Sequence, residues 1–214
     1  MSAADTQANQ PAASRRGFIG GAALFALAIG VPAAAVRLSD LHDEDAPTPA
    51  LRAMLREVSQ LVIPRSATPG AGDIGVGDFL VFALAHGMEG TRAPVANPAP
   101  GLPLRADGSL RHAAWLASEL DRRAGGNWLA APAPRRAETL AALDREAYPE
   151  GPPPAVPSPW RAIKGLILTG YYTSEVGGSQ ELRYELVPGR YDADIPLTPD
   201  YRAWSSDWTA VDFG

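Results

Sequence analysis

Proline and glycine divide this chain into short segments, and this division constrains its fold more than any other feature. The chain holds 21 glycines and 21 prolines among 214 residues. Proline interrupts helix interiors and glycine favours turns, so long regular elements have little room between them. Thr48-Pro49 and Ser158-Pro159 are both helix starts, because a hydroxyl side chain caps a first turn and proline suits the first helical position. We therefore expect a body of short helices.

Apolar residues recur at helical spacing between these breakers. A first helix follows Thr48 and ends before Pro64, and a third begins with Ser109 as its cap and ends at Gly125-Gly126. Three further helices are expected over residues 77–87, 134–148 and 159–170. The helix at 77–87 is apolar on most sides, which predicts a central position. Strand signals are thin, with one short strand at most in 181–187. The predicted fold class is all-α, with about five helices and an irregular, aromatic-rich C-terminal arm.

Two proline-rich stretches connect the predicted helices. Residues 90–108 have no apolar period, which predicts a surface excursion. Residues 149–159 hold six prolines and predict a stiff spacer. We divide the chain into a signal at 1–35, a helical body at 36–157, and a last helix with a docking arm at 158–214.

The C-terminal arm is rich in aromatic side chains but lacks a regular period. Residues 170–208 contain seven of the sixteen aromatic residues in the chain. Glycines and prolines interrupt the arm throughout, so its rings cannot share one helical face. Tyrosine and tryptophan combine an apolar ring with a polar tip and are enriched at interfaces. Two alternatives follow: the arm packs on its own helices, or it binds a partner. The predicted partner-binding residues are Tyr171, Tyr172, Glu175, Tyr184, Tyr191, Trp204 and Trp208.

The N-terminal residues have the pattern of a twin-arginine export signal. Arg15 and Arg16 precede Phe18, and residues 19–36 carry no charge. Small residues at 33–35 then stand at the spacing of a cleavage site. The alternative is a membrane anchor, since 18 uncharged residues approach the length that spans a bilayer, but four glycines or prolines disfavour it. Twin-arginine export carries folded proteins, so we expect the chain to fold before it crosses the membrane and to be periplasmic.

Composition excludes several classes of function. The chain has no cysteine, which excludes disulfides, thiolate metal sites and covalent attachment of haem c to this chain. Its formal net charge of -5 and its scattered arginines show no basic surface for nucleic acid. Nucleic acid is therefore not an expected partner.

The sequence shows no reaction centre. His42, His86 and His112 lie far apart without metal-ligand spacing, and no serine lies in a G-x-S-x-G motif. Glu181 and its neighbours Glu175 and Glu185 are candidates for acid–base chemistry, but solvated surface carboxylates are the favoured interpretation. The glycines at 70–75 and 177–178 lack the strand–turn–helix context of a nucleotide site. We predict no catalytic, cofactor-binding or metal-binding residue in this chain.

Two blocks of residues resemble a known family. The first contains Ile63-Pro64 and Thr68-Pro69-Gly70-Ala71. The second contains Gly170-Tyr171-Tyr172-Thr173-Ser174-Glu175, Gly177-Gly178, Leu182-Arg183-Tyr184 and Pro188-Gly189. These motifs resemble the gluconate 2-dehydrogenase subunit 3 family, the small subunit of membrane-associated, FAD-dependent sugar and sugar-acid dehydrogenases. The resemblance covers roughly 51–84 and 160–208, and the excursion at 90–108 is less typical of it.

This resemblance implies that the chain works in a complex. The expected partners are a large flavoprotein subunit of the glucose-methanol-choline oxidoreductase type, often a multihaem cytochrome c, and the twin-arginine translocon. FAD and haem c would lie in the partner subunits. The small subunit would carry the export signal for the large one, help it mature as a chaperone, and associate with the inner membrane through the complex. Two alternatives stay open: an independent periplasmic enzyme, and a structural protein anchored by an uncut signal.

Overall fold

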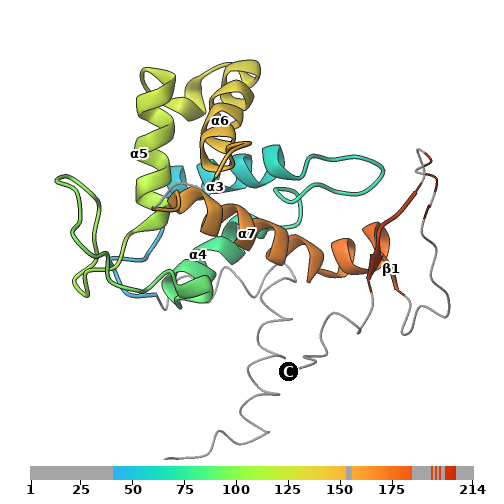
Figure 1. Cartoon of the computed structure of the whole chain (residues 1–214), viewed down its shortest axis with the longest axis horizontal. Helices are drawn as coiled ribbons and strands as arrows, with labels where there is room; N and C mark the ends of the chain where they lie inside the picture. The colour runs from blue at the N-terminus through green and yellow to red at the C-terminus, as the bar shows by residue number, and fades with distance from the viewer. Residues whose placement is uncertain are drawn as a thin grey trace, which may run out of the picture.

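The computed structural model describes residues 41–152, 156–184 and 201–205, together with positions 194, 196 and 198, and these residues fold mainly as helices (Figure 1). Five α-helices occur in the described part: α3 (Pro49–Val62), α4 (Val76–Ala85), α5 (His112–Ala124), α6 (Ala133–Ala147) and α7 (Pro159–Tyr172). Two short 3₁₀ helices, η1 (Met88–Gly90) and η2 (Trp128–Ala130), and a π-helical turn, η3 (Gly177–Glu181), accompany them. The all-α prediction is confirmed.

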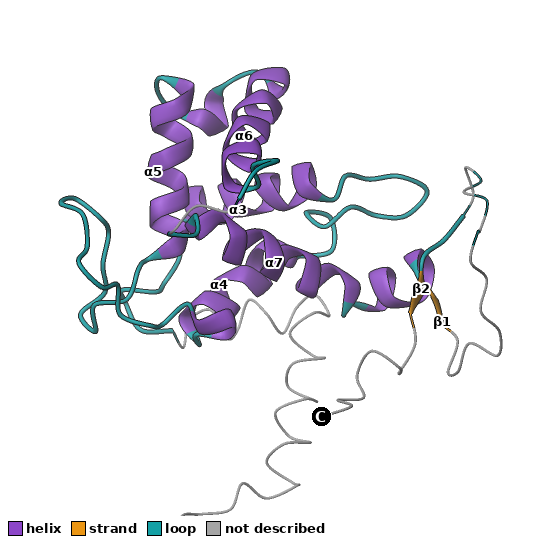
Figure 2. Ribbon diagram, in the orientation of Figure 1, coloured by secondary structure: helices purple, strands orange, loops and turns teal. Residues whose placement is uncertain are grey.

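Two very short strands are the regular β structure of the described residues. β1 (Arg183–Tyr184) pairs in parallel with β2 (Trp204–Ser205), with Arg183 opposite Trp204 (Figure 2). The stretch predicted as one short strand at most therefore contributes two residues of strand. The aromatic-rich arm lies largely outside the described residues.

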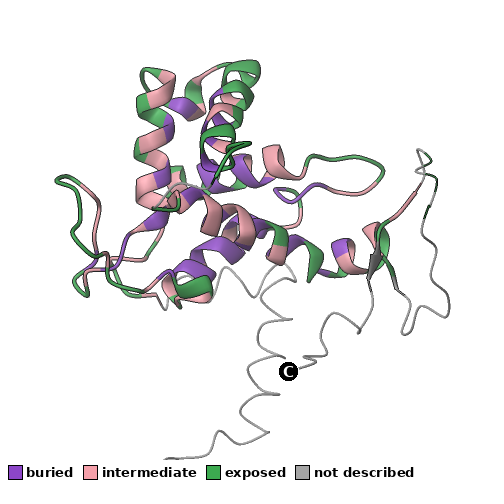
Figure 3. Ribbon diagram, viewed as in Figure 1, coloured by how far each residue is buried: buried purple, intermediate pink, exposed green. Residues whose placement is uncertain are grey.

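Helix α4 is the centre of the body, as its apolar sequence predicts. It packs against both α3 and α7, and seven of its ten residues are buried. Figure 3 shows buried residues along α4. Gly77 lets α4 approach α3 closely, because a Cβ at this position would lie 2.8 Å from the backbone nitrogen of Arg56. The helix contacts are therefore set by backbone approach as well as by side-chain burial.

Helices α5 and α6 form a neighbouring pair above this centre (Figure 1). Trp128 of η2 lies between them with 1% of its surface exposed, and its indole N–H donates to the carbonyl of Arg136 at 3.2 Å. Arg123 pairs with Glu119 on its own helix and with Glu146 on α6, each at 2.6 Å. The connection between the two helices is thus closed by a buried ring and bridging charges.

Most of the predicted helix ends are confirmed. The hydroxyl of Thr48 accepts from the backbone N–H of Leu51 at 3.1 Å, and Ser158 caps α7 through Trp160 at 3.3 Å. Gly125 ends α5 in the left-handed conformation, with φ of 77°. The first-turn proline of both capped helices also stands where the sequence places it.

The predicted cap at Ser109 is wrong. Helix α5 begins at His112, and Ser109 instead donates both its backbone N–H and its hydroxyl to Asp107. Bridges from Pro94 to Ser109 and from Leu104 to Leu110 keep the chain extended up to the helix. The hydroxyl is therefore used in the preceding turn, which also holds the pKa of the Asp107 carboxyl below its ordinary value.

The two proline-rich connections have different outcomes. The excursion at 90–108 forms no α-helix, and two bridges connect it to Ser109 and Leu110, just before α5. Part of the predicted spacer, residues 153–155, lies outside the described residues. In the described part of the chain, no helix combines the length and apolar character needed to cross a bilayer.

Candidate partner-binding site

The two sequence blocks that carry the family resemblance meet in space, although about a hundred residues separate them. The hydroxyl of Tyr171, on the last turn of α7, donates to the carbonyl oxygen of Pro69 at 3.0 Å. The hydroxyl of Thr68 lies 3.4 Å from the same phenol oxygen and donates to the carboxylate of Glu181. We call these four residues the junction. It joins the loop after α3 to the end of α7 and the turn that follows.

Two glycines of the second block permit this arrangement. A Cβ at Gly170 would overlap the ring of Phe79 on α4, so glycine allows α7 to cross α4 closely. A Cβ at Gly177 would overlap the backbone carbonyl of Tyr171, so glycine also allows η3 to fold back on the end of α7. At Gly177 the overlapped atoms are backbone, which cannot move aside as a side chain can, and at Gly170 the buried ring of Phe79 would have to shift. Both glycines therefore belong to the geometry of the junction.

The loop side of the junction is ordered by Asp73. Its carboxylate accepts from the backbone N–H of Gly70 at 2.9 Å and pairs with Arg65 at 3.0 Å. The Gly70 N–H, followed by Arg65, lowers the pKa of the Asp73 carboxyl below its ordinary value. Gly70 and Gly72 both lie against Gln60 of α3, where a Cβ would collide with its side chain. The first block thus forms a fixed loop on α3.

The segment after η3 is held beside the same end of α7. The guanidinium of Arg202 donates to the carbonyls of Leu182 at 2.6 Å, Ser179 at 3.2 Å and Glu181 at 3.3 Å. These carbonyls lie at the end of a helical turn, where cationic donors are favoured. Residues 201–205 consequently return to the body, and β2 pairs there with β1.

The sequence pattern of one protein family, described as gluconate 2-dehydrogenase subunit 3, matches residues 49–189. The chain belongs to this family. The match runs from the start of α3 through η3 and β1, so it includes both blocks of the junction. The family is named for one subunit of a dehydrogenase, which places the chain among the subunits of gluconate 2-dehydrogenase-type complexes. Comparisons with curated proteins and with solved structures found no match.

The residues that the sequence predicts to bind a partner fall into three groups. Tyr171 is 1% exposed and packs in the hydrophobic core, so for this ring the structure favours the own-domain alternative over partner contact. Burial also raises the pKa of its phenol. Tyr172 is 41% exposed, and Glu175 is exposed as well. The other positions lie in β1 and β2 with backbone alone described, or outside the described residues: Tyr184, Trp204, Tyr191 and Trp208.

A second polar cluster was not anticipated from the sequence. Asp45, just before α3, pairs with Arg105 at 2.6 Å and with Arg92 at 3.0 Å. We call these three residues the N-terminal clamp. The side chains of Asp45 and Arg105 are 8% and 4% exposed, and Arg105 also donates to the carbonyls of Leu84 and Leu110. The clamp fastens the first described residues to the 90–108 excursion.

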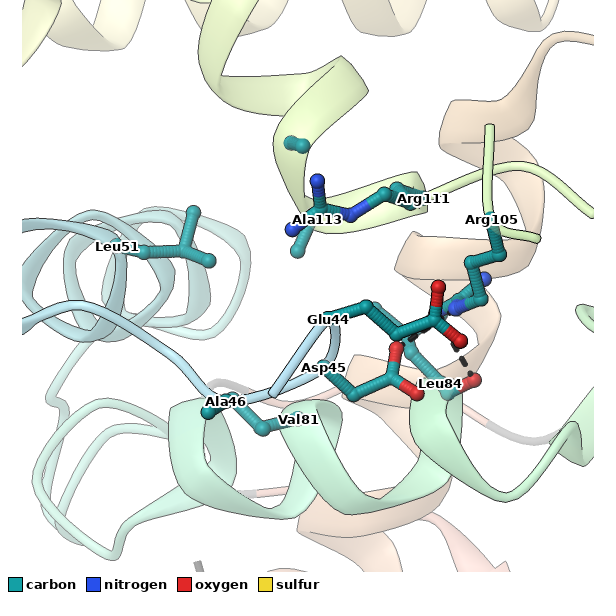
Figure 4. A pocket seen from close by; sticks show the side chains of 10 residues that line it. Glu44, Asp45, Ala46, Leu51, Val81, Leu84, Arg105, Arg111 and Ala113 are labelled. Carbon is teal, nitrogen blue, oxygen red and sulfur yellow. Dashed lines mark hydrogen bonds and ion pairs between the residues drawn. The ribbon is translucent and has the colours of Figure 1, made fainter. Parts of the chain in front are cut away.

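The clamp borders a small cavity (Figure 4). The cavity measures about 40 Å³ and is also lined by Glu44, Leu51 and Arg111. Small-molecule sites commonly measure about 300–1,000 Å³, so this space suits water rather than a cofactor. Arg105 and Asp45 converge on it in Figure 4, with Arg111 on the opposite side. The charged side chains around the cavity connect separate segments of the chain to one another.

The histidines remain separate in the folded chain. His112 is buried and its Nδ1 lies 2.9 Å from the carbonyl oxygen of Leu110, while His86 stacks on Phe82 at 6.5 Å between ring centroids. Burial lowers the pKa of His112, and the nearby Arg105 adds to this effect. Among the described residues, no group of three or more histidine, aspartate or glutamate side chains is arranged to hold a metal ion. The described polar clusters join segments of the chain to one another.

Proposed function

We propose that this chain is the non-catalytic small subunit of an FAD-dependent sugar or sugar-acid dehydrogenase complex. It carries a twin-arginine signal in residues 1–35, binds the large glucose-methanol-choline-type flavoprotein in the cytoplasm, helps it mature, and takes it to the periplasm. FAD belongs to the large subunit, and haem c belongs to a cytochrome subunit where one is present. The complex is held at the inner membrane by its other members.

The family match is the observation that carries this proposal. A family named as one numbered subunit of gluconate 2-dehydrogenase implies other subunits, and a dehydrogenase of this class needs a redox cofactor. The chain's own sequence then supplies the export function, because Arg15-Arg16 stand before Phe18 and an uncharged run. A partner without its own signal would cross the membrane only when bound to a chain that has one.

The folded body is consistent with export in the folded state. Asp45 lies ten residues after the predicted cleavage site at Ala35, and it is already buried against Arg105. In a twin-arginine substrate, we expect a fold that begins this close to the signal to form before translocation.

Replacement of both Arg15 and Arg16 by lysine tests the proposal. We expect both the small subunit and the flavoprotein to stay in the cytoplasm, so that dye-linked sugar dehydrogenase activity disappears from the periplasmic and membrane fractions. Immunoblots of the fractions and activity assays measure this. Arg56→Lys, on the exposed face of α3, is the matched control and should leave export normal. Normal periplasmic activity of the double variant would refute the export function.

A further inference from the structure

Exposed apolar side chains are concentrated around the last helix. Four large hydrophobic residues are exposed in the described part of the chain: Tyr148 at 42%, Val156 at 82%, Leu168 at 38% and Tyr172 at 41%. All four lie between positions 148 and 172, while the large apolar side chains of the other described helices are buried or half-buried. Single exposed hydrophobic residues are ordinary, but a local concentration of them marks an interaction surface.

Helix α7 has two different faces. At about 100° per residue, positions 161, 164, 168 and 172 fall within an arc of about 80° and extend about 16 Å along the axis. The opposite side is formed by Ile163, Leu166 and Ile167, each fully buried. Helix α7 therefore fills the core with one face and presents Arg161, Lys164, Leu168 and Tyr172 on the other.

Tyr148 extends this outer face across to α6. Arg161 lies 4.9 Å and Lys164 lies 4.8 Å from the centroid of the Tyr148 ring. Lys164 also pairs with Asp144 at 2.7 Å. The Asp144–Lys164 pair borders an apolar groove of about 220 Å³ between α3, α6 and α7, which is also lined by Leu61, Val62, Ala137, Leu140, Ala141 and Trp160. Lys164 belongs to the groove, to the Tyr148 contact and to the α7 stripe, so these three features adjoin one another.

The exposed aromatic rings are already held in place. The ring of Tyr172 stands edge-on to the buried Tyr171 ring, at 5.2 Å between centroids and 86° between planes. Arg161 and Lys164 hold the ring of Tyr148 through cation–π contacts. A side chain that is fixed before binding loses less conformational entropy on binding. Tyrosine and arginine are also the residue types that most often dominate interface energies.

Charge indicates the chemistry of the partner. Within the described residues, Arg161 has a ring contact but no carboxylate partner, whereas Lys164 has Asp144. A docked surface therefore gains most by offering a carboxylate to Arg161 and apolar side chains to Leu168 and Tyr172.

We infer that the face formed by Tyr148, Arg161, Leu168 and Tyr172, the α7 face, is the docking surface for the large flavoprotein subunit, which meets Arg161 with an acidic side chain. This inference rests on the proposed function and assigns its binding surface to the helix rather than to the arm alone. Tyr171 anchors the face from the inside, since its ring supports Tyr172 while its hydroxyl bonds to Pro69.

Charge reversal and removal of the two apolar anchors test the docking surface. The chain is co-expressed with the flavoprotein that co-purifies with the wild type, identified by its mass and flavin absorbance. Arg161→Glu and the double variant Leu168→Ser/Tyr172→Ser are each expected to weaken the complex by about tenfold or more. Arg56→Glu on α3 is the matched control, because Arg56 is exposed and has no carboxylate partner in the described residues. The control should bind within about twofold of wild type.

The outcomes separate the proposed function from the docking surface. Failure of the wild-type chain to hold any flavoprotein would refute the proposed function itself. Wild-type binding together with full binding by both α7 variants would overturn the docking surface alone. Loss of binding in Arg56→Glu but not in Arg161→Glu would move the surface to α3. Thermal unfolding of the isolated chain gives a further readout: a lower midpoint in the double variant with the complex intact would mean that the chain's own residues cover this face, which also overturns the inference.

Discussion

The N-terminal clamp and the junction perform the same task by different physical means. Each fastens an irregular segment to the helical body across a long sequence separation. In the clamp, Asp45 pairs with two arginines, and the side chains of Asp45 and Arg105 are nearly buried. The junction uses hydroxyl groups around Glu181 together with glycines that leave no space for a Cβ. The clamp should therefore be sensitive to charge and the junction to volume.

This difference follows from what each contact loses when it is disturbed. A buried ion pair contributes little net stability, but removing one partner leaves the other charge without compensation. A close backbone contact loses little when a neighbouring side chain is trimmed, but an added methyl group must displace backbone atoms. Substitutions that change charge at constant size, or size at constant charge, therefore separate the two regions.

The largest effect is expected from Asp45→Ala. Arg105 would stay buried without a carboxylate, at a cost of about 3–5 kcal/mol in the free energy of unfolding. Urea unfolding of the full chain measures it. The matched control is Arg122→Ala on α5, which removes an exposed arginine from its pair with Glu119 and should change the free energy of unfolding far less. Equal losses in the two variants would show that Arg105 finds water or another partner, and that the clamp is an ordinary surface contact.

Gly177→Ala should have the next largest effect. The added methyl group overlaps the carbonyl of Tyr171, so we expect a loss of about 1–3 kcal/mol in the free energy of unfolding. Gly165→Ala provides the opposite control within α7, because no heavy atom stands near its Cβ position. Alanine is the better helix former, so this variant should gain up to about 1 kcal/mol. A loss of stability in Gly165→Ala, or no loss in Gly177→Ala, would show that the space available for a Cβ does not determine the stability of the junction.

The local signals in the sequence predicted the helices well. Thr48, Ser158 and Gly125 act within one helical turn, so their hydrogen bonds and backbone angles are encoded by neighbouring residues. The helix cap predicted at Ser109 does not form, because the Ser109 hydroxyl has a nearer partner in Asp107 than in the helix that follows. Caps compete with turns for the same short polar side chains.

The long-range contacts were beyond such signals. Nothing in the local sequence pairs Asp45 with Arg105, since sixty residues separate them and neither belongs to a motif. The glycines of the junction were visible as part of a family pattern, but their role is to admit Phe79 and the Tyr171 carbonyl, which are three-dimensional neighbours. The buried state of Tyr171 was likewise open, because an aromatic residue at the end of a helix can face either the core or a partner.

The smallest expected effect is a pH dependence between about pH 8 and pH 5.5 that arises from His112, a neighbour of Arg105 in the clamp. Burial gives His112 a lower pKa in the folded chain than the ordinary value of about 6.5 expected in the unfolded chain. Below this value the unfolded chain binds a proton that the folded chain excludes, so stability falls as pH decreases toward the folded pKa and is fully present above about pH 7.5. His112→Asn keeps an amide that can donate to Leu110 but removes the titration. Wild type and variant should therefore have similar unfolding midpoints at pH 8, while the wild type loses more than the variant at pH 5.5. The steric loss in Gly177→Ala should be the same at both pH values, because it arises from overlap rather than protonation. An equal pH response of wild type and His112→Asn would mean that another group causes the acid sensitivity.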